Sequence, residues 1–296
     1  MSAAPSYLGE RGGDVMNGRR TAPRRTAGGR RVLRGGRTER IRRAIRNRWT
    51  ERSVRALACL LALPLLALLL VPRQETAGAA QTGAMSAGQD REKYIALTFD
   101  DGPWPVTTEL LLDGLAERDA KATFFLIGEQ IGAMEDTVRR MQAEGHQVGN
   151  HTYTHMDLSR GDSAERLREI EKTDETLRAL LGEGSYWLRP PWGFLAADTA
   201  QEVRVPMVYW SLDTEDWRRL DTDAVAQHII NDVRSGDIVL LHDPYSTSVE
   251  AALRAIDALA AQGYRFITLE ELFAMEGVTP RMGTLYVRPD EEKPLQ

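Results

Sequence analysis

Short apolar segments alternate with longer amphipathic segments along residues 92–275, and this alternation restricts the chain to few folds. The apolar segments predict strands at residues 94–99, 122–127, 147–150, 186–188, 207–211, 238–241 and 264–267. The amphipathic segments predict helices at residues 107–118, 133–144, 163–181, 223–233 and 249–262. Strands joined through helices run parallel, because a parallel pair needs a long crossover connection. We therefore expect an α/β fold built on a parallel sheet or barrel.

The first 55 residues differ in composition from the rest of the chain. They contain 16 Arg, no Lys and four acidic residues, which gives a net charge near +12. Because the whole chain carries −5, the remainder carries about −17. Only Tyr7 and Trp49 interrupt the basic stretch as aromatic residues, and no folded DNA- or RNA-binding motif is present. We interpret residues 1–55 as a disordered, Arg-rich cytoplasmic tail and expect no nucleic-acid partner.

Residues 56–72 are a run of 17 residues without charge, dominated by Leu and Ala. As a helix this run would be about 26 Å long, near the short limit for crossing a bilayer. The Arg residues before it predict a cytoplasmic N-terminus and an exported C-terminal part. Ala77-Gly78-Ala79 resembles a signal-peptide cleavage site, whereas the long basic lead and Arg73 favour a retained membrane anchor. The exported part is therefore expected either on the outer side of the cell membrane or, after cleavage, secreted.

Four smaller observations complete the expected organisation. Residues 73–91 are rich in Ala, Gly, Gln and Ser and predict a flexible linker, while Met16 offers an alternative start of translation. Residues 276–296 are expected to be a C-terminal extension, to which we assign no function. Cys59 is the single cysteine, so no disulfide forms within the chain and the exported part depends on its hydrophobic core.

Five short motifs lie beside predicted strands. They are Thr98-Phe99-Asp100-Asp101-Gly102-Pro103, His151-Thr152-Tyr153-Thr154-His155, Arg189-Pro190-Pro191-Trp192-Gly193, Asp213-Thr214-Glu215-Asp216-Trp217 and Leu240-Leu241-His242. Each motif alone has an ordinary structural explanation, such as a turn, a surface histidine pair or a salt bridge. Carboxyl ends of parallel strands meet at one edge of a fold, where such folds place their chemistry. The five motifs together therefore predict one hydrolytic site.

In this order the motifs resemble the polysaccharide deacetylases of carbohydrate esterase family 4, also described as the NodB homology domain, which includes the chitooligosaccharide deacetylases of rhizobia. The resemblance covers residues 92–275, which we interpret as the catalytic domain. It implies a distorted, incomplete (β/α) barrel. It also implies a metal-dependent hydrolase that removes acetyl groups from an acetylated polysaccharide.

The resemblance implies a metal site made of Asp101, His151 and His155. Two His and one carboxylate are a common zinc set, which leaves a position open for water. The two His are four residues apart, so a helical turn would place both rings on one side. We expect Zn²⁺, with Co²⁺ or another divalent ion left open.

The resemblance assigns the catalytic work to four side chains. Asp100 is expected to be the base that takes a proton from water, and Arg189 to orient it. His242 is expected to be the general acid, and Asp216 the carboxylate that stabilises its protonated form. An ordinary salt bridge at the rim of the fold is the alternative for Arg189.

Three further residues are expected to contact substrate. Trp192 provides the first backbone amide after two prolines, and the resemblance places that amide at the oxyanion. Trp217 and Leu240 are expected to line a small apolar pocket for the acetyl methyl group. His146 and His228 lie outside every motif and are interpreted as surface or structural residues.

We therefore expect an exported, metal-dependent N-deacetylase acting on an aminosugar polymer, with peptidoglycan or a chitin-like glycan as its partner. An O-acetyl esterase acting on xylan is the alternative within enzymes, because the same chemistry cleaves esters. A catalytically silent glycan-binding protein is the alternative outside enzymes, and such a protein is expected to lack the base, a metal ligand or the acid.

Overall fold

The computed structural model describes residues 92–294, and the predicted tail, apolar run and linker lie outside this range. A six-stranded sheet forms its centre, with β3, β2, β1, β6 and β5 side by side and β7 paired with the first residues of β1. Its strands are β1 (Lys93–Gly102), β2 (Thr123–Leu126), β3 (Gln147–Asn150), β5 (Leu212–Asp213), β6 (Ile238–His242) and β7 (Tyr264–Phe266). Each of these strand pairs is parallel, which confirms the predicted α/β architecture.

The helices connect the strands as the alternating pattern predicts. Their bounds are α2 (Thr107–Glu117), α3 (Gly128–Ile131), α4 (Glu135–Ala143), α5 (Ser163–Leu181), α6 (Ala197–Glu202), α7 (Asp216–Arg219), α8 (Thr222–Asp232), α9 (Ser246–Ala260) and α10 (Leu269–Met275). The five predicted helices are present within a few residues of their expected bounds. The short helices α3, α6, α7 and α10 were not predicted, since two turns or fewer are too short to establish a periodic pattern.

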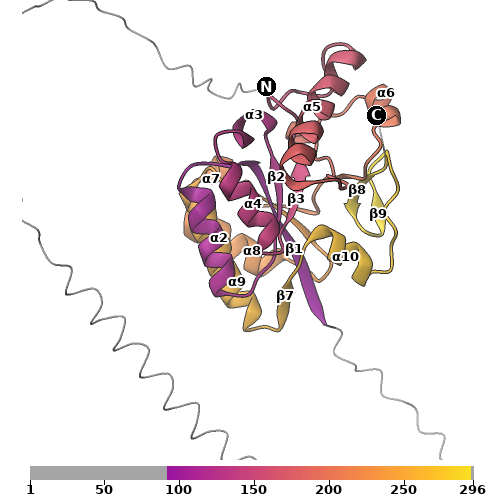
Figure 1. Cartoon of the computed structure of the whole chain (residues 1–296). Helices are drawn as coiled ribbons and strands as arrows, with labels where there is room; N and C mark the ends of the chain where they lie inside the picture. The colour runs from indigo at the N-terminus through magenta and orange to yellow at the C-terminus, as the bar shows by residue number, and fades with distance from the viewer. Residues whose placement is uncertain (1–91, 295–296) are drawn as a thin grey trace, which may run out of the picture. The chain divides into compact units, whose positions relative to one another are not determined.

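The two sides of β1 bury different parts of the molecule. Ile95, Leu97 and Phe99 belong to the cluster of buried side chains that also includes residues of α2, α4, α8 and α9. Ala96 belongs to a second cluster, formed with residues of α10 and of the C-terminal strand Leu285–Arg288. In Figure 1, α2 and α9 accordingly lie to one side of β1, and α10 lies to the other. Because side chains alternate along a strand, Thr98 and Asp100 share the side of Ala96.

The parallel sheet of the expected incomplete barrel is confirmed, but the described strands do not continue around a barrel. Beyond β3 the pairing continues through Leu188 alone, which bridges Asn150 and Met207. The predicted strand at residues 207–211 is divided, because β4 (Met207–Val208) pairs with β8 and the chain reaches β6 only at Leu212. Within residues 92–294 the strands therefore form no closed barrel.

The segment after residue 275 belongs to the folded unit, unlike the extension expected from the sequence. β8 (Leu285–Arg288) pairs in parallel with β4 and antiparallel with β9 (Glu291–Glu292). Leu285 and Tyr286 are buried, and the Tyr286 ring packs edge-on against Phe273 with 5.0 Å between centroids. Among the described helices, none is long and apolar enough to cross a bilayer.

Candidate metal centre and active site

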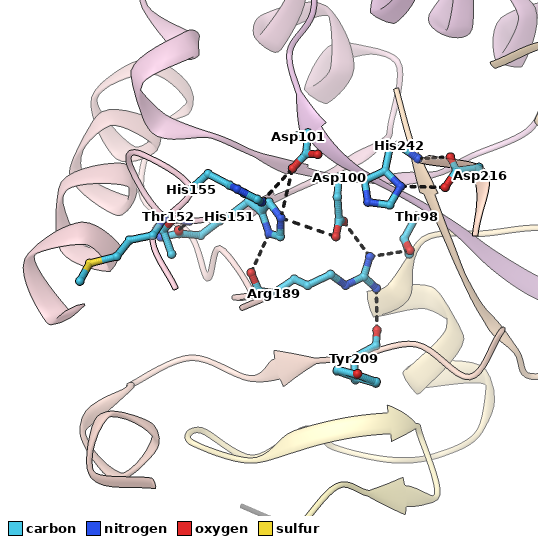
Figure 2. A network of polar contacts seen from close by, with 12 residues as sticks. Thr98, Asp100, Asp101, His151, Thr152, His155, Arg189, Tyr209, Asp216 and His242 are labelled. Carbon is cyan, nitrogen blue, oxygen red and sulfur yellow. Dashed lines mark hydrogen bonds and ion pairs between the residues drawn. The ribbon is translucent and has the colours of Figure 1, made fainter. Parts of the chain in front are cut away.

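The predicted site residues lie at the carboxyl ends of three strands of the parallel sheet. Asp100 and Asp101 lie near the end of β1, His151 directly follows β3, and His242 is the last residue of β6. Asp100 and His242 are aligned partners in the β1–β6 pair, so the strand register itself places the two side by side. Figure 2 shows these residues converging with Arg189 and Asp216.

Asp101, His151 and His155 present three ligand atoms that lie within 4.8 Å of one another. The Oδ1 atom of Asp101 is 3.4 Å from Nε2 of His151 and 3.2 Å from Nε2 of His155. This oxygen is buried and has no conventional hydrogen bond among the described residues. One carboxylate and two imidazoles facing a common point fit a divalent cation such as Zn²⁺ or Co²⁺.

The charge state of Asp101 suits this arrangement. Burial acts to raise its pKa, but the contacts with His151 and His155 outweigh burial and hold the pKa well below its ordinary value. The carboxylate is therefore ionised at neutral pH and available as a ligand.

A backbone contact fixes the orientation of the His151 ring. Nδ1 of His151 lies 2.7 Å from the carbonyl oxygen of Arg189, and a carbonyl only accepts. Nδ1 is therefore the donor in this contact, and Nε2 is the ring nitrogen that faces Asp101.

A turn with an unusual backbone brings the rings of His151 and His155 together. The helical turn predicted from their spacing is wrong. Residues 151–157 contain no helix, and Thr152 and His155 adopt left-handed backbone conformations with φ of 64° and 61°. The ring centroids of His151 and His155 are nevertheless 5.0 Å apart. Spacing indicated that the rings would be neighbours, but the local conformation that achieves this is different.

Asp100 is buried, and its two oxygens have different surroundings. Oδ1 accepts a hydrogen bond of 2.9 Å from Nη1 of Arg189, whereas Oδ2 lies 3.7 Å from Nε2 of His151. Arg189 is fully buried; its Nη1 atom also donates to Oγ1 of Thr98 and its Nη2 atom to the carbonyl oxygen of Tyr209, each at 2.7 Å. One oxygen of Asp100 is thereby fixed, and the other faces the metal ligands (Figure 2).

His242, which is partly buried, pairs with the fully buried Asp216. Asp216 accepts from the backbone amide of His242 through Oδ2 and contacts Nδ1 through Oδ1, both at 2.8 Å. Burial alone would lower the pKa of His242, but the hydrogen bond and charge of Asp216 raise it to about 9. The ring is therefore protonated at neutral pH, with Nε2 left as the donor toward the site.

Trp192 and Gly193 form a tight turn beside the metal ligands. Trp192 has φ of 53°, its side chain is half exposed, and its ring centroid is 4.3 Å from that of His155. Gly193 has φ of 71°, and a Cβ atom there would lie 2.0 Å from the Tyr209 ring. Among the described residues, no hydrogen bond uses the Trp192 amide.

The two residues expected to share an apolar pocket differ in exposure. Leu240 is buried in β6 between its partners Thr98 and Asp213. Trp217 follows Asp216 at the start of α7, and half of its surface is exposed. A pocket lined by both residues stays a prediction.

Sequence reasoning missed several residues that contact the site. Thr98 lies two positions before Asp100 on the same side of β1, so the period of a strand offered a signal for it. Tyr209 acts through its carbonyl, which no side-chain pattern reveals. Asp243, directly after His242, is fully buried and accepts from Oγ1 of Thr108, and burial raises its pKa to about 7.

Three residues outside the predicted site have structural surroundings. Asp213 accepts a 2.9 Å hydrogen bond from the Glu215 amide, two residues later. The buried His146 accepts from the Ala122 amide, and burial lowers its pKa to about 4. His228 lies on α8, partly buried, with Nε2 3.6 Å from Oδ2 of Asp232.

Comparison with known proteins points to one family. A family profile described as polysaccharide deacetylase matches residues 87–206. The peptidoglycan-N-acetylmuramic acid deacetylase PdaC of Bacillus subtilis is 35% identical over 181 residues, which cover 61% of this chain and 39% of PdaC. The chain thus spans about two fifths of the length of the first curated relatives it matches.

Two further relatives match over more of their length. A peptidoglycan-N-acetylglucosamine deacetylase of Bacillus cereus is 34% identical over 194 residues, covering 63% of this chain and 70% of that protein. A family 4 acetyl xylan esterase from Clostridium thermocellum, solved with a cobalt ion, superposes with a TM-score of 0.63 and 32% identity. The superposition covers 66% of this chain and 98% of the esterase chain.

Proposed function

Because this chain belongs to the polysaccharide deacetylase family, we propose that it is an exported hydrolase that removes N-acetyl groups from an aminosugar polymer. The observation that carries the proposal is the convergence of Asp101, His151 and His155 beside Asp100, whose partner in the strand register is His242. A metal-ligand set, a buried carboxylate and a protonated imidazole are the three parts that metal-assisted amide hydrolysis needs.

Asp101, His151 and His155 hold the metal in this proposal. When bound, a divalent ion supplies a Lewis acid that lowers the pKa of water and polarises an acyl carbonyl. Asp100 takes the proton of the attacking water through Oδ2, because Arg189 occupies Oδ1 and fixes the orientation of the carboxylate.

His242 delivers a proton to the departing sugar nitrogen through Nε2. Asp216 holds Nδ1 and the backbone amide of His242, so the ring has a fixed direction and keeps its proton at neutral pH. The Trp192 amide donates to the oxyanion, and the left-handed backbone of Trp192 and Gly193 gives the turn its shape. Acetate and a free amine are the products.

Peptidoglycan is the substrate that the proposal favours. Two of the relatives described above are named as deacetylases of peptidoglycan, one for N-acetylmuramic acid and one for N-acetylglucosamine. An exported position fits this choice, and it follows from the apolar run at residues 56–72 with its Arg-rich lead. The same run provides the proposed attachment to the cell membrane, or a signal peptide if it is cleaved.

An O-acetyl esterase is the second candidate, favoured by the likeness to the Clostridium thermocellum esterase. The residues that cleave an amide also cleave an ester, so the site itself does not separate the two. A silent glycan-binding protein is disfavoured, since base, acid and all three metal-ligand residues are present and converge.

The assignment of roles is tested with two variants of the full chain and two matched controls. Asp100→Asn and His242→Ala are each expected to lower kcat for acetate release by about 10²–10⁴ while the protein retains its metal. Asp136→Asn, exposed on α4, and His228→Ala should leave both activity and metal content unchanged. Loss of metal in Asp100→Asn or His242→Ala would show that the roles are assigned wrongly.

A further inference from the structure

The turn that carries His151 and His155 is held at its carbonyl groups by the start of α3. The carbonyl oxygen of Thr152 accepts a 2.9 Å hydrogen bond from the Gly128 amide. That of Tyr153 accepts a 3.0 Å hydrogen bond from the Glu129 amide. Space is tight here, since a Cβ atom on Gly128 would lie 2.6 Å from the Tyr153 ring.

The same turn is held at its amide groups by one carboxylate of α5. Oε2 of Glu169 accepts from the Tyr153 amide at 3.1 Å and from the Thr154 amide at 2.7 Å. It also accepts from the Thr154 hydroxyl at 3.0 Å. Three donors therefore converge on one carboxylate oxygen, and hydrogen bonds to a carboxylate restrain a turn more strongly than neutral hydrogen bonds do.

Neighbouring residues of α5 strengthen this contact. The Nζ atom of Lys172 lies 3.5 Å from the centroid of the Tyr153 ring, a cation–π contact one helical turn after Glu169. Glu171, between the two in sequence, is exposed and makes none of these contacts. Glu169 and Lys172 thus contact the turn, whereas Glu171 does not.

The turn needs such restraint because of its backbone. Thr152 and His155 both adopt left-handed conformations, which non-glycine residues keep only when their surroundings impose them. His155 lies directly after the residues that Glu169 binds, and His151 lies two positions before Tyr153. Holding the amides of residues 153 and 154 therefore limits how far both rings move relative to Asp101.

We propose that Glu169 is a positioning residue that sets the metal affinity of the Asp101–His151–His155 site. It touches neither metal nor substrate and acts through the backbone of the turn. The inference rests on the proposed function, because it requires that these three residues bind a metal ion.

The test measures metal binding, independently of catalysis, on the full chain. Metal-free wild type, Glu169→Ala, Glu169→Gln and the control Glu171→Ala are titrated with Zn²⁺ and Co²⁺ alone, in competition with a chromogenic chelator. Glu169→Ala is expected to raise Kd by about 10–100-fold and to alter the Co²⁺ absorption spectrum. Glu169→Gln, which keeps an acceptor oxygen without the charge, should show a smaller increase, and Glu171→Ala should match wild type.

The unfolding temperature of each metal-free variant separates positioning from general stability. If Glu169→Ala unfolds earlier but binds both ions as tightly as Glu171→Ala, the inference is overturned. If wild type itself binds neither ion, the proposed metal site is contradicted, and the role of Glu169 is contradicted as well. A raised Kd in protein that is still fully folded supports the role of Glu169.

Discussion

At the scale of single residues, unusual backbone conformations concentrate around the site. Eight non-glycine residues of the described chain have positive φ, and five of them are Asp101, Thr152, His155, Trp192 and Glu215. Each of the five belongs to one of the motifs found in the sequence. Strain of this kind persists where surrounding contacts impose it, and such residues cluster at functional sites. The motifs are therefore constrained in backbone shape as well as in side-chain chemistry.

The His242–Asp216 pair predicts how activity depends on pH. The pKa of His242 is about 9, so kcat/KM should fall as pH rises through about 9. In Asp216→Asn the hydrogen bond and charge of Asp216 are lost, burial still lowers the pKa of His242, and only the charges of Asp101 and Asp100 still raise it, so the basic limb should move to lower pH. Profiles of kcat/KM for both proteins check this shift, and an unmoved basic limb would contradict the role of Asp216.

The same pair predicts a stability trend. The pKa of His242 is raised in the folded protein above its ordinary value of 6.5. Its contribution to the free energy of unfolding is thus fully present below about pH 6.5 and is lost as pH rises through about 9. Asp216→Asn should flatten this part of the stability curve, measured by denaturant unfolding between pH 6 and 10.

The sequence identified the side chains of the site but not the groups that hold them. Asp100, Asp101, His151, His155, Arg189, Asp216 and His242 were all named from motifs, and the structure brings them together. The carbonyl of Tyr209 and the carboxylate of Glu169 were not found. The first is a backbone group, and the second lies in the helix after the motif, where it resembles any exposed helical glutamate.

At the scale of elements, the turn at Trp192 and Gly193 depends on the irregular segment between β4 and β5. The Tyr209 ring fills the space beside Gly193 and stacks on Trp210 with 3.7 Å between centroids. Nζ of Lys293 lies over the same ring, 3.3 Å from the centroid of Tyr209. The interruption that keeps β4 and β5 from forming one strand thus supports the proposed oxyanion turn.

This packing predicts that Gly193→Ala is damaging. The new methyl group would lie 2.0 Å from the Tyr209 ring, and the φ of 71° disfavours any side chain. We expect kcat to fall at least about 10-fold because the Trp192 amide is displaced from the oxyanion. Gly132→Ala is the matched control, since no atom lies within 4 Å of a Cβ there and its φ is −61°. Equal kcat in both variants would contradict the proposed oxyanion role.

Long elements were predictable and short ones were not. α5 was predicted with its observed bounds, because 19 residues give several turns of periodic apolar positions. β4 and β5 contain two residues each, and their division follows from tertiary pairing with β8 and β6. β8 itself lies among Pro, Gly and charged residues that conceal a buried strand, so residues 276–296 were expected to be an extension.

At the scale of the whole folded unit, the proposed metal site joins segments far apart in sequence. Asp101 comes from β1, and His151 and His155 come from the turn after β3, about 50 residues later. An unfolded chain does not hold these ligands together, so metal binding should stabilise the folded state.

The size of this stabilisation follows from mass action. With free Zn²⁺ at 100 times Kd, the free energy of unfolding should rise by about 2.7 kcal/mol, and a chelator should reverse the gain. Thermal unfolding of wild type and Asp101→Ala, each with Zn²⁺ and with chelator, measures it. Asp101→Ala should show no dependence on Zn²⁺, and a dependence equal to that of wild type would place the metal elsewhere.

Acetate release by the metal-loaded full chain from peptidoglycan, chitooligosaccharides and acetylxylan tests the central claim most directly. Chelator treatment and Asp100→Asn serve as controls. The account predicts release from at least one aminosugar substrate, abolished by chelator and strongly reduced by Asp100→Asn. Release from acetylxylan alone would make the protein an esterase. Absence of release from all three substrates, with metal bound, would contradict the proposed deacetylase.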